Sequence, residues 1–89
     1  MNNVVIVGAG KEGKGTFGDI FNENNWNITF LDKDESVINQ LNSKGKYEVE
    51  ALYVDHTELH DITNYKAYLI NKTLDYLDCI VDADVIVLA

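Results

Sequence analysis

The stretch VVIVGAGKEG, residues 4–13, decides the fold of this chain. Residues 4–7 are all β-branched and do not alternate with polar residues, which is typical of a strand buried on both faces of a parallel sheet. Gly8, Gly10 and Gly13 then match the pattern G-x-G-x-x-G. Where this pattern follows a buried strand and opens a helix, it indicates a domain that binds a dinucleotide.

The next part of the chain continues the alternation of strand and helix. Residues 17–21 carry apolar side chains at i, i+3 and i+4, the spacing of one helical face. Residues 28–31 predict a second buried strand. Asp34 as N-cap and Gly45 after the last turn bound a second predicted helix.

After this helix the period of the pattern changes. Apolar and charged residues alternate over residues 46–51, which we take as the third strand along the chain, and strand-like pieces follow at 59–62 and 65–70. We expect a hairpin or meander there, then a helix over 74–81 and a buried strand over 85–88. The prediction is an α/β, Rossmann-type parallel sheet, truncated, with strand order about 3-2-1-4, flanking helices and a β-hairpin excursion.

Composition limits the function classes. The 89 residues carry a net charge of −8 and predict one domain, residues 1–89. All seven cations are lysine, so we expect no nucleic-acid partner. No apolar run approaches the roughly 20 residues that cross a bilayer, so we expect no membrane partner. A single cysteine, Cys79, and no charged leader predict a cytoplasmic protein.

Each glycine of the motif has a mechanical role. Gly8 permits the tight turn, Gly10 lets a pyrophosphate approach the backbone, and Gly13 lets the helix pack closely on the strand. The helix N-terminus then offers N–H groups and a positive dipole to the phosphates. Lys11 and Lys14 are placed to offset phosphate charge, although solvated surface lysines are the more common outcome. The alternative is a glycine-rich turn that binds nothing.

Asp32 ends the second predicted strand, 24 residues after Gly8. An acid at this position accepts hydrogen bonds from the ribose hydroxyls; the alternative is an ordinary carboxylate at a helix N-terminus. Since a carboxylate here repels the 2′-phosphate of NADP and Lys33 is only a flexible counter-charge, we expect NAD as the cofactor. The expected cofactor-binding residues are Gly8, Ala9, Gly10, Lys11, Glu12, Gly13, Asp32 and Lys33.

Several short stretches carry a resemblance to a known family. They are Gly8-Ala9-Gly10, Gly13-Lys14-Gly15, residues 28–32, Leu41-Asn42 and residues 47–50, within a region from about residue 4 to 54. This region resembles the N-terminal domain of the mannitol-1-phosphate 5-dehydrogenase family and its polyol dehydrogenase relatives. The family has arginine and phenylalanine where this chain has Lys14 and Thr16.

The resemblance implies an NAD-dependent oxidoreductase that interconverts a sugar-alcohol phosphate and a ketose phosphate. The family's catalytic lysine and substrate pocket lie in a C-terminal helical domain, which we expect to be missing here. We therefore expect no catalytic residue in this chain, an NAD(H)-binding domain that is inactive alone, and substrate binding only in the full-length protein. A truncated sheet would leave residues 85–88 at an edge, where we expect self-association.

Two other functions stay open. The first is a regulatory module that binds NAD without turnover, because residues 55–57, after the third predicted strand, faintly resemble the acidic turn of such modules. The strands expected over residues 56–70 argue against it. The second is an S-adenosylmethionine-dependent methyltransferase, which shares a glycine loop and a ribose-binding acid but prefers a different spacing of the third glycine.

Two further features predict no chemistry. His56, Glu58 and His60 would share one face of a strand, or the two histidines would lie at i and i+4 of a helix, and either arrangement could reach a metal. The order H-T-E-L-H, however, differs from the metalloprotease pattern H-E-x-x-H. We expect a solvated hairpin face there and no metal site. Cys79 lies among apolar residues, so we expect a small thiol in the core rather than a nucleophile.

Overall fold

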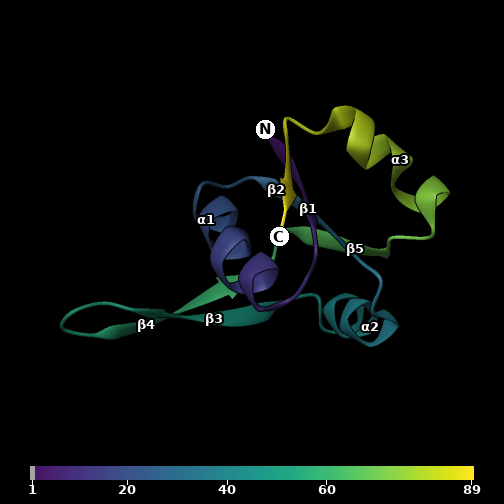
Figure 1. The fold of residues 1–89 in the computed structure, drawn as a ribbon. Helices are drawn as coiled ribbons and strands as arrows, with labels where there is room; N and C mark the ends of the chain where they lie inside the picture. Colours follow the sequence, from purple (N-terminus) through teal and green to yellow (C-terminus); the bar gives the residue numbers. More distant parts are fainter. Residues whose placement is uncertain (1) are drawn as a thin grey trace.

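The computed structural model describes residues 2–89 as a four-stranded parallel sheet flanked by helices, with a two-stranded hairpin beside it (Figure 1). The strands of the sheet are β1 (Asn3–Val7), β2 (Asn27–Asp32), β5 (Tyr65–Leu69) and β6 (Val85–Leu88). The hairpin is formed by β3 (Tyr47–Leu52) and β4 (Thr57–Ile62). The helical elements are η1 (Lys11–Phe17), α1 (Gly18–Glu23), α2 (Glu35–Lys44) and α3 (Thr73–Asp82).

The order of the sheet is β5-β2-β1-β6, and all three pairings are parallel. Counting only these four strands along the chain, the order is 3-2-1-4, so the predicted α/β class and order are confirmed. The identity of the third strand was wrong. Residues 47–52 pair with β4 outside the sheet, and β5 takes the third place beside β2.

The two central strands are buried because helices cover both faces of the sheet. Val4 and Ile6 of β1 pack with Phe30 and with α1 and α2 on one face, whereas Val5 and Leu31 pack with α3 on the other. Figure 1 shows this division, with α3 on the opposite side of the strands from α1 and α2. The uninterrupted β-branched run of β1 therefore serves two cores.

Helix α2 begins and ends as its sequence predicts. The Asp34 side chain accepts hydrogen bonds from the backbone N–H of Ser36 and Val37. At the other end Gly45 adopts φ +69°, and its N–H donates to the carbonyl of Leu41. The cap and the left-handed glycine fix the two ends of α2, which connects β2 to β3 in the sequence.

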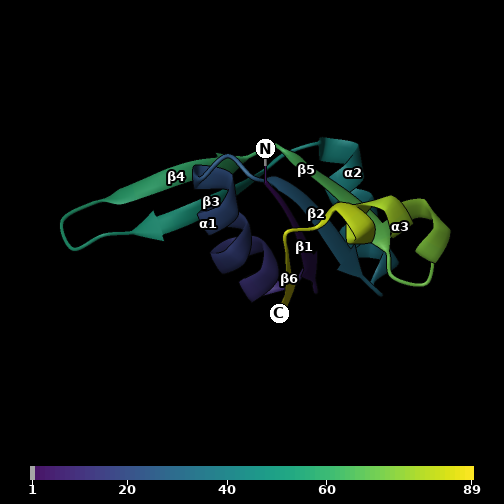
Figure 2. The same cartoon turned by 90° about the horizontal axis from the view of Figure 1, so that it is seen from above.

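The hairpin leaves the body of the molecule as an arm. Tyr47 pairs with Ile62 at its base and Leu52 with Thr57 near its tip, and both views show the arm pointing away from the sheet (Figure 2). Ile62 is completely buried in the larger core, whereas Leu52 near the tip is 76% exposed. The predicted hairpin is thus confirmed, anchored by its base.

No helix within residues 2–89 is both long and apolar enough to cross a membrane.

Candidate functional site

The glycine loop lies at the carboxyl edge of the sheet, where the chain turns from β1 into η1. Gly8 adopts φ +108°, a region that side chains other than hydrogen rarely allow. Its N–H donates to the carbonyl of Leu31 at 2.7 Å, and a Cβ on Gly8 would lie 2.9 Å from the carbonyl oxygen of Ala89. Gly8 therefore joins the ends of three parallel strands: β1, β2 and β6.

Gly13 and Gly10 have opposite surroundings. A Cβ on Gly13 would overlap the carbonyl oxygen of Gly8, so only glycine lets η1 approach the loop this closely. A Cβ on Gly10 would meet nothing within 4 Å, because the backbone there faces open space. The steric roles expected for Gly8 and Gly13 are thus present, and Gly10 leaves its backbone accessible to a ligand.

Asp32 holds the glycine loop against the end of β2. Its Oδ2 accepts a hydrogen bond from the N–H of Ala9 at 2.7 Å, and its Oδ1 accepts one from the N–H of Asp34 at 2.8 Å. Burial raises the pKa of this carboxyl, but the backbone donors, with Ala9 first, outweigh burial and hold the pKa below its usual value. Asp32 is therefore an oriented anion, and its two oxygens keep lone pairs for further donors.

The helix after the loop begins with wide turns that the sequence did not predict. The N–H of Gly18 donates to the carbonyl of Gly13, five residues earlier, so η1 is a π-helical segment. The Tyr47 hydroxyl donates to the carbonyl of Lys14 at 2.8 Å, and a Cβ on Gly18 would overlap that hydroxyl. Burial raises the Tyr47 pKa, so the phenol keeps its proton. The closely spaced glycines at positions 13, 15 and 18 were the feature of the sequence that could have indicated these wide turns.

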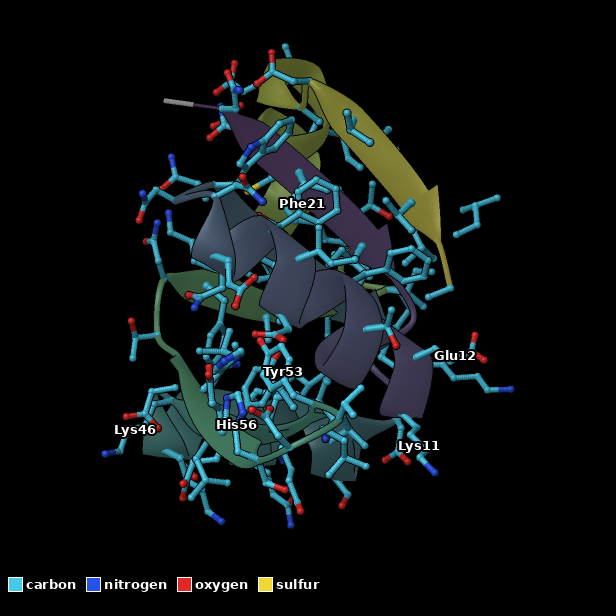
Figure 3. All side chains as sticks on the ribbon, turned by 90° about the vertical axis from the view of Figure 1, so that its left-hand side faces the viewer. Lys11, Glu12, Phe21, Lys46, Tyr53 and His56 are labelled. Atoms are coloured by element: carbon cyan, nitrogen blue, oxygen red, sulfur yellow. The ribbon has the colours of Figure 1, made fainter. Side chains whose placement is uncertain are left out.

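The charged side chains of the loop lie on the surface. Figure 3 shows Lys11 and Glu12 pointing away from the body at the start of η1, and Lys33 is also exposed.

Lys11 and Lys14 line an open hollow of about 730 Å³ between η1 and β3, opposite Glu48 and Glu50. A second hollow of about 390 Å³ lies at the amino ends of the strands, away from the glycine loop.

The three residues singled out on the hairpin do share one face. Glu58 contacts both histidines, with its carboxylate oxygens 2.8 Å from His56 Nε2 and 2.9 Å from His60 Nε2. The His56 ring also stacks on Tyr53, beside it in Figure 3. The side chain of His56 is 49% exposed, as expected of a solvated face, but that of His60 is only 15% exposed. For His60 the prediction of a solvated face was wrong, because helix α1 covers it.

Asp55 and His56 lie in the turn of the hairpin and Thr57 begins β4, so residues 55–57 do not follow the third strand of the parallel sheet. The feature that favoured a regulatory module is therefore remote from the carboxyl edge of the sheet. Cys79 lies on α3, is partly buried and packs against the core residues Val5 and Leu31, as expected of a core thiol.

Comparison with known proteins identifies the relatives of the chain. No protein-family model matches it. Over 64 residues, 72% of this chain, it is 38% identical to the mannitol-1-phosphate 5-dehydrogenases of Streptococcus pneumoniae strains JJA and Hungary19A-6. The matched segment is the N-terminal portion of those proteins and amounts to 17% of their length.

Proposed function

From the confirmed resemblance of this chain to the N-terminal portion of mannitol-1-phosphate 5-dehydrogenases, we propose that residues 1–89 are the N-terminal part of an NAD(H)-binding domain of an oxidoreductase. The observation that carries the proposal is the arrangement at the carboxyl edge of the sheet. The glycine loop, the start of a helix and Asp32 meet there beside the end of β6.

The topology supports a ligand at this edge. Strands β2 and β5 follow β1 on one side, and β6 lies on its other side, so the strand order reverses between β1 and β6. In open α/β sheets ligands bind outside the carboxyl ends of the strands at such a point. The open backbone at Gly10 and the first N–H groups of η1 are the proposed contacts for the pyrophosphate.

Asp32 is the proposed partner of the adenosine ribose. Its oxygens, already oriented by Ala9 and Asp34, keep acceptor capacity for the ribose hydroxyls. The 2′-phosphate of NADP would bring negative charge beside this carboxylate. A unit pair at ~4 Å and an effective dielectric of ~20 repels by about 4 kcal/mol, which salt and exposure reduce to about 1–2 kcal/mol. We therefore expect NAD to be preferred by about 5- to 30-fold.

Calorimetric titration of the chain with NAD and with NADP tests the proposal. We expect tighter binding of NAD, and weaker NAD binding with a narrower gap for Asp32→Ala. Glu35→Gln is the matched control, because it removes the same charge from an exposed position three residues along. Equal or tighter binding of NADP by the unmodified chain would overturn the role given to Asp32, and no binding of either would overturn the proposed function of these residues.

In the full-length protein the proposed reaction is hydride transfer between NAD and a sugar-alcohol phosphate such as mannitol 1-phosphate, which the names of the relatives suggest. The cofactor would supply the redox chemistry, and Gly8–Gly13 and Asp32 would position it. We propose no catalytic residue in this chain and expect it to be inactive alone. Turnover of mannitol 1-phosphate with NAD that follows the purified chain would contradict this.

Two further proposals concern the setting of the domain. A cytoplasmic location fits the resemblance and the single cysteine. Self-association is proposed at β6, which forms an edge of the sheet in residues 2–89 and exposes half of Ile86 and most of Leu88. An apolar strand edge offers backbone donors and acceptors to a second copy of the chain.

A further inference from the structure

A cluster of ionisable side chains lies where the hairpin meets helix α1, apart from the glycine loop. Asp19 and Glu23 are four residues apart on α1, and His60 projects toward them from β4. His60 Nδ1 lies 2.9 Å from Asp19 Oδ1 and 3.3 Å from Glu23 Oε1. Within residues 2–89 these three side chains place one donor atom each within 4.8 Å of one another.

The spacing of the donor atoms fits a small metal ion. Zinc binds histidine nitrogen and carboxylate oxygen at about 2.0–2.2 Å, so neighbouring ligands of a tetrahedral site lie about 3.4 Å apart. The two separations from His60 Nδ1, 2.9 and 3.3 Å, are close to this value. A movement of the Glu23 carboxylate, whose side chain is 54% exposed, would complete a three-ligand site with one open position.

The second nitrogen of His60 is held as it is in metal-binding histidines. Its Nε2 lies 2.9 Å from Glu58 Oε1, so the ring orientation is fixed by a carboxylate on the same strand. A histidine ligand commonly donates its other N–H to a carboxylate, which fixes the tautomer and increases the basicity of the ligating nitrogen. Asp19 and His60 are also shielded, with 18% and 15% of their side chains exposed.

The charge balance favours a cation with more than one positive charge. The carboxylates of Asp19, Glu23 and Glu58 all face the one imidazole. A proton on His60 leaves two negative charges unbalanced. A divalent ion would balance Asp19 and Glu23 while the neutral ring donates its Nε2 hydrogen to Glu58.

We propose that Asp19, Glu23 and His60 bind a divalent first-row transition metal ion and that Glu58 orients His60. The nitrogen ligand favours ions such as Zn²⁺ and Co²⁺ over Mg²⁺, which prefers oxygen ligands and retained water. Because the ligands come from α1 and β4, a bound ion would fasten the hairpin to the body of the domain.

The test is calorimetric titration of the chelator-treated chain with Zn²⁺, Co²⁺ and Mg²⁺, with the visible absorption of Co²⁺ reporting its coordination. We expect one Zn²⁺ or Co²⁺ per chain, much weaker binding of Mg²⁺, and loss of at least about tenfold in affinity for His60→Gln and for Asp19→Asn. His56→Gln is the matched control, since His56 lies in the hairpin turn and contacts Glu58 but has no contact with Asp19 or Glu23 among the described residues. Its affinity should stay near that of the unmodified chain.

One measurement separates this site from adventitious binding on an acidic surface. Glu58 orients His60 but is not one of the proposed ligands, so Glu58→Gln should cost about 10- to 100-fold in affinity. No Zn²⁺ or Co²⁺ binding, or equal affinity in His60→Gln and His56→Gln, would overturn the proposal. If His60→Gln does not fold by circular dichroism, Asp19→Asn and Glu23→Gln decide it.

Discussion

The parallel sheet and the hairpin arm use similar apolar residues in opposite ways. Val4, Val5 and Ile6 of β1 are at most 1% exposed. On the arm, Val54 at the tip is fully exposed, and Leu59, midway along β4, is 67% exposed. Since apolar residues stabilise a fold only by the area they remove from water, the sheet carries the stability of the domain and the tip of the arm contributes little.

The base of the arm resembles the sheet, because its apolar side chains are buried. Ile62 is completely buried in the larger core, and the Asn22 side chain donates to the carbonyl of Asp61 at 3.1 Å. His60 adds its contacts to α1. The hairpin is thus held at one end by packing and polar contacts, and its free end is open to solvent. Three experiments test this difference between sheet and arm, and a fourth tests the junction of the glycine loop with η1.

The largest effect should come from the centre of the sheet. Phe30 is completely buried and packs edge-on against Tyr47 and Tyr65. Phe30→Ala should lower the free energy of unfolding by about 3–5 kcal/mol through lost burial and a cavity. Leu59→Ala on the arm is the control and should change it by less than about 0.5 kcal/mol. Urea unfolding measures both, and comparable losses would contradict the division.

The second effect concerns the junction of the loop and η1. A Cβ on Gly13 would overlap the Gly8 carbonyl, whereas a Cβ on Gly15 would meet nothing within 4 Å. Gly13→Ala should therefore cost about 1–3 kcal/mol of unfolding free energy. Gly15→Ala, two residues along in the same segment, should be neutral or stabilise by up to about 1 kcal/mol. Equal unfolding midpoints in urea for the two variants would show that the close contact at Gly13 carries no stability.

The third effect concerns association. If β6 pairs with a second copy, light scattering at about 100 μM should give a mass above that of one chain. Ile86→Lys places a charge on that edge and should restore the monomer. Leu59→Lys places the same charge on the arm and should not change the mass. A monomeric unmodified chain would contradict association at β6, and a monomer produced only by Leu59→Lys would locate it on the arm instead.

The sequence predicted the two central strands of the sheet better than the third strand, for a physical reason. Strands buried on both faces have short, mainly apolar runs that few other structures accommodate; residues 4–7 are entirely apolar, and residues 28–31 contain only Thr29 as a polar residue. Residues 65–69 are only partly apolar, so their pattern does not say whether they pair within a hairpin or beside β2. That choice depends on how the chain returns to the sheet, which a local pattern does not contain.

The candidate site divides in the same way. The glycine positions and Asp32 are readable from spacing, because the turn, the helix and the end of β2 are all local features. The contact between His60 and Asp19 joins residues 41 apart and exists because the hairpin folds back on α1. Asp19 and Glu23 at i and i+4 were a visible indication of two carboxylates on one helical face, but not of their partner.

The smallest effect is a dependence of stability on pH that comes from this contact. Hydrogen bonds to Glu58 and Asp19 raise the pKa of His60 from 6.5 to about 9. A group whose pKa is raised by folding stabilises the folded chain fully below its unfolded pKa, about 6.5, and this stabilisation is lost as the pH rises through about 9. The lowered pKa of Glu58 acts only below about pH 4.5 and does not enter this window.

With a chelator present, the melting temperature of the unmodified chain should therefore fall between pH 6 and pH 9, and His60→Gln should reduce that fall. The pKa of His56 is also raised, by Glu58 and Asp55, but its side chain is 49% exposed, so solvent screens its ion pairs. His56→Gln should keep most of the pH dependence. Other titrating groups contribute equally to both variants, so comparing the variants removes their effect. If His56→Gln reduces the fall in melting temperature more than His60→Gln does, the exposed part of the arm, and not its junction with α1, responds to protons.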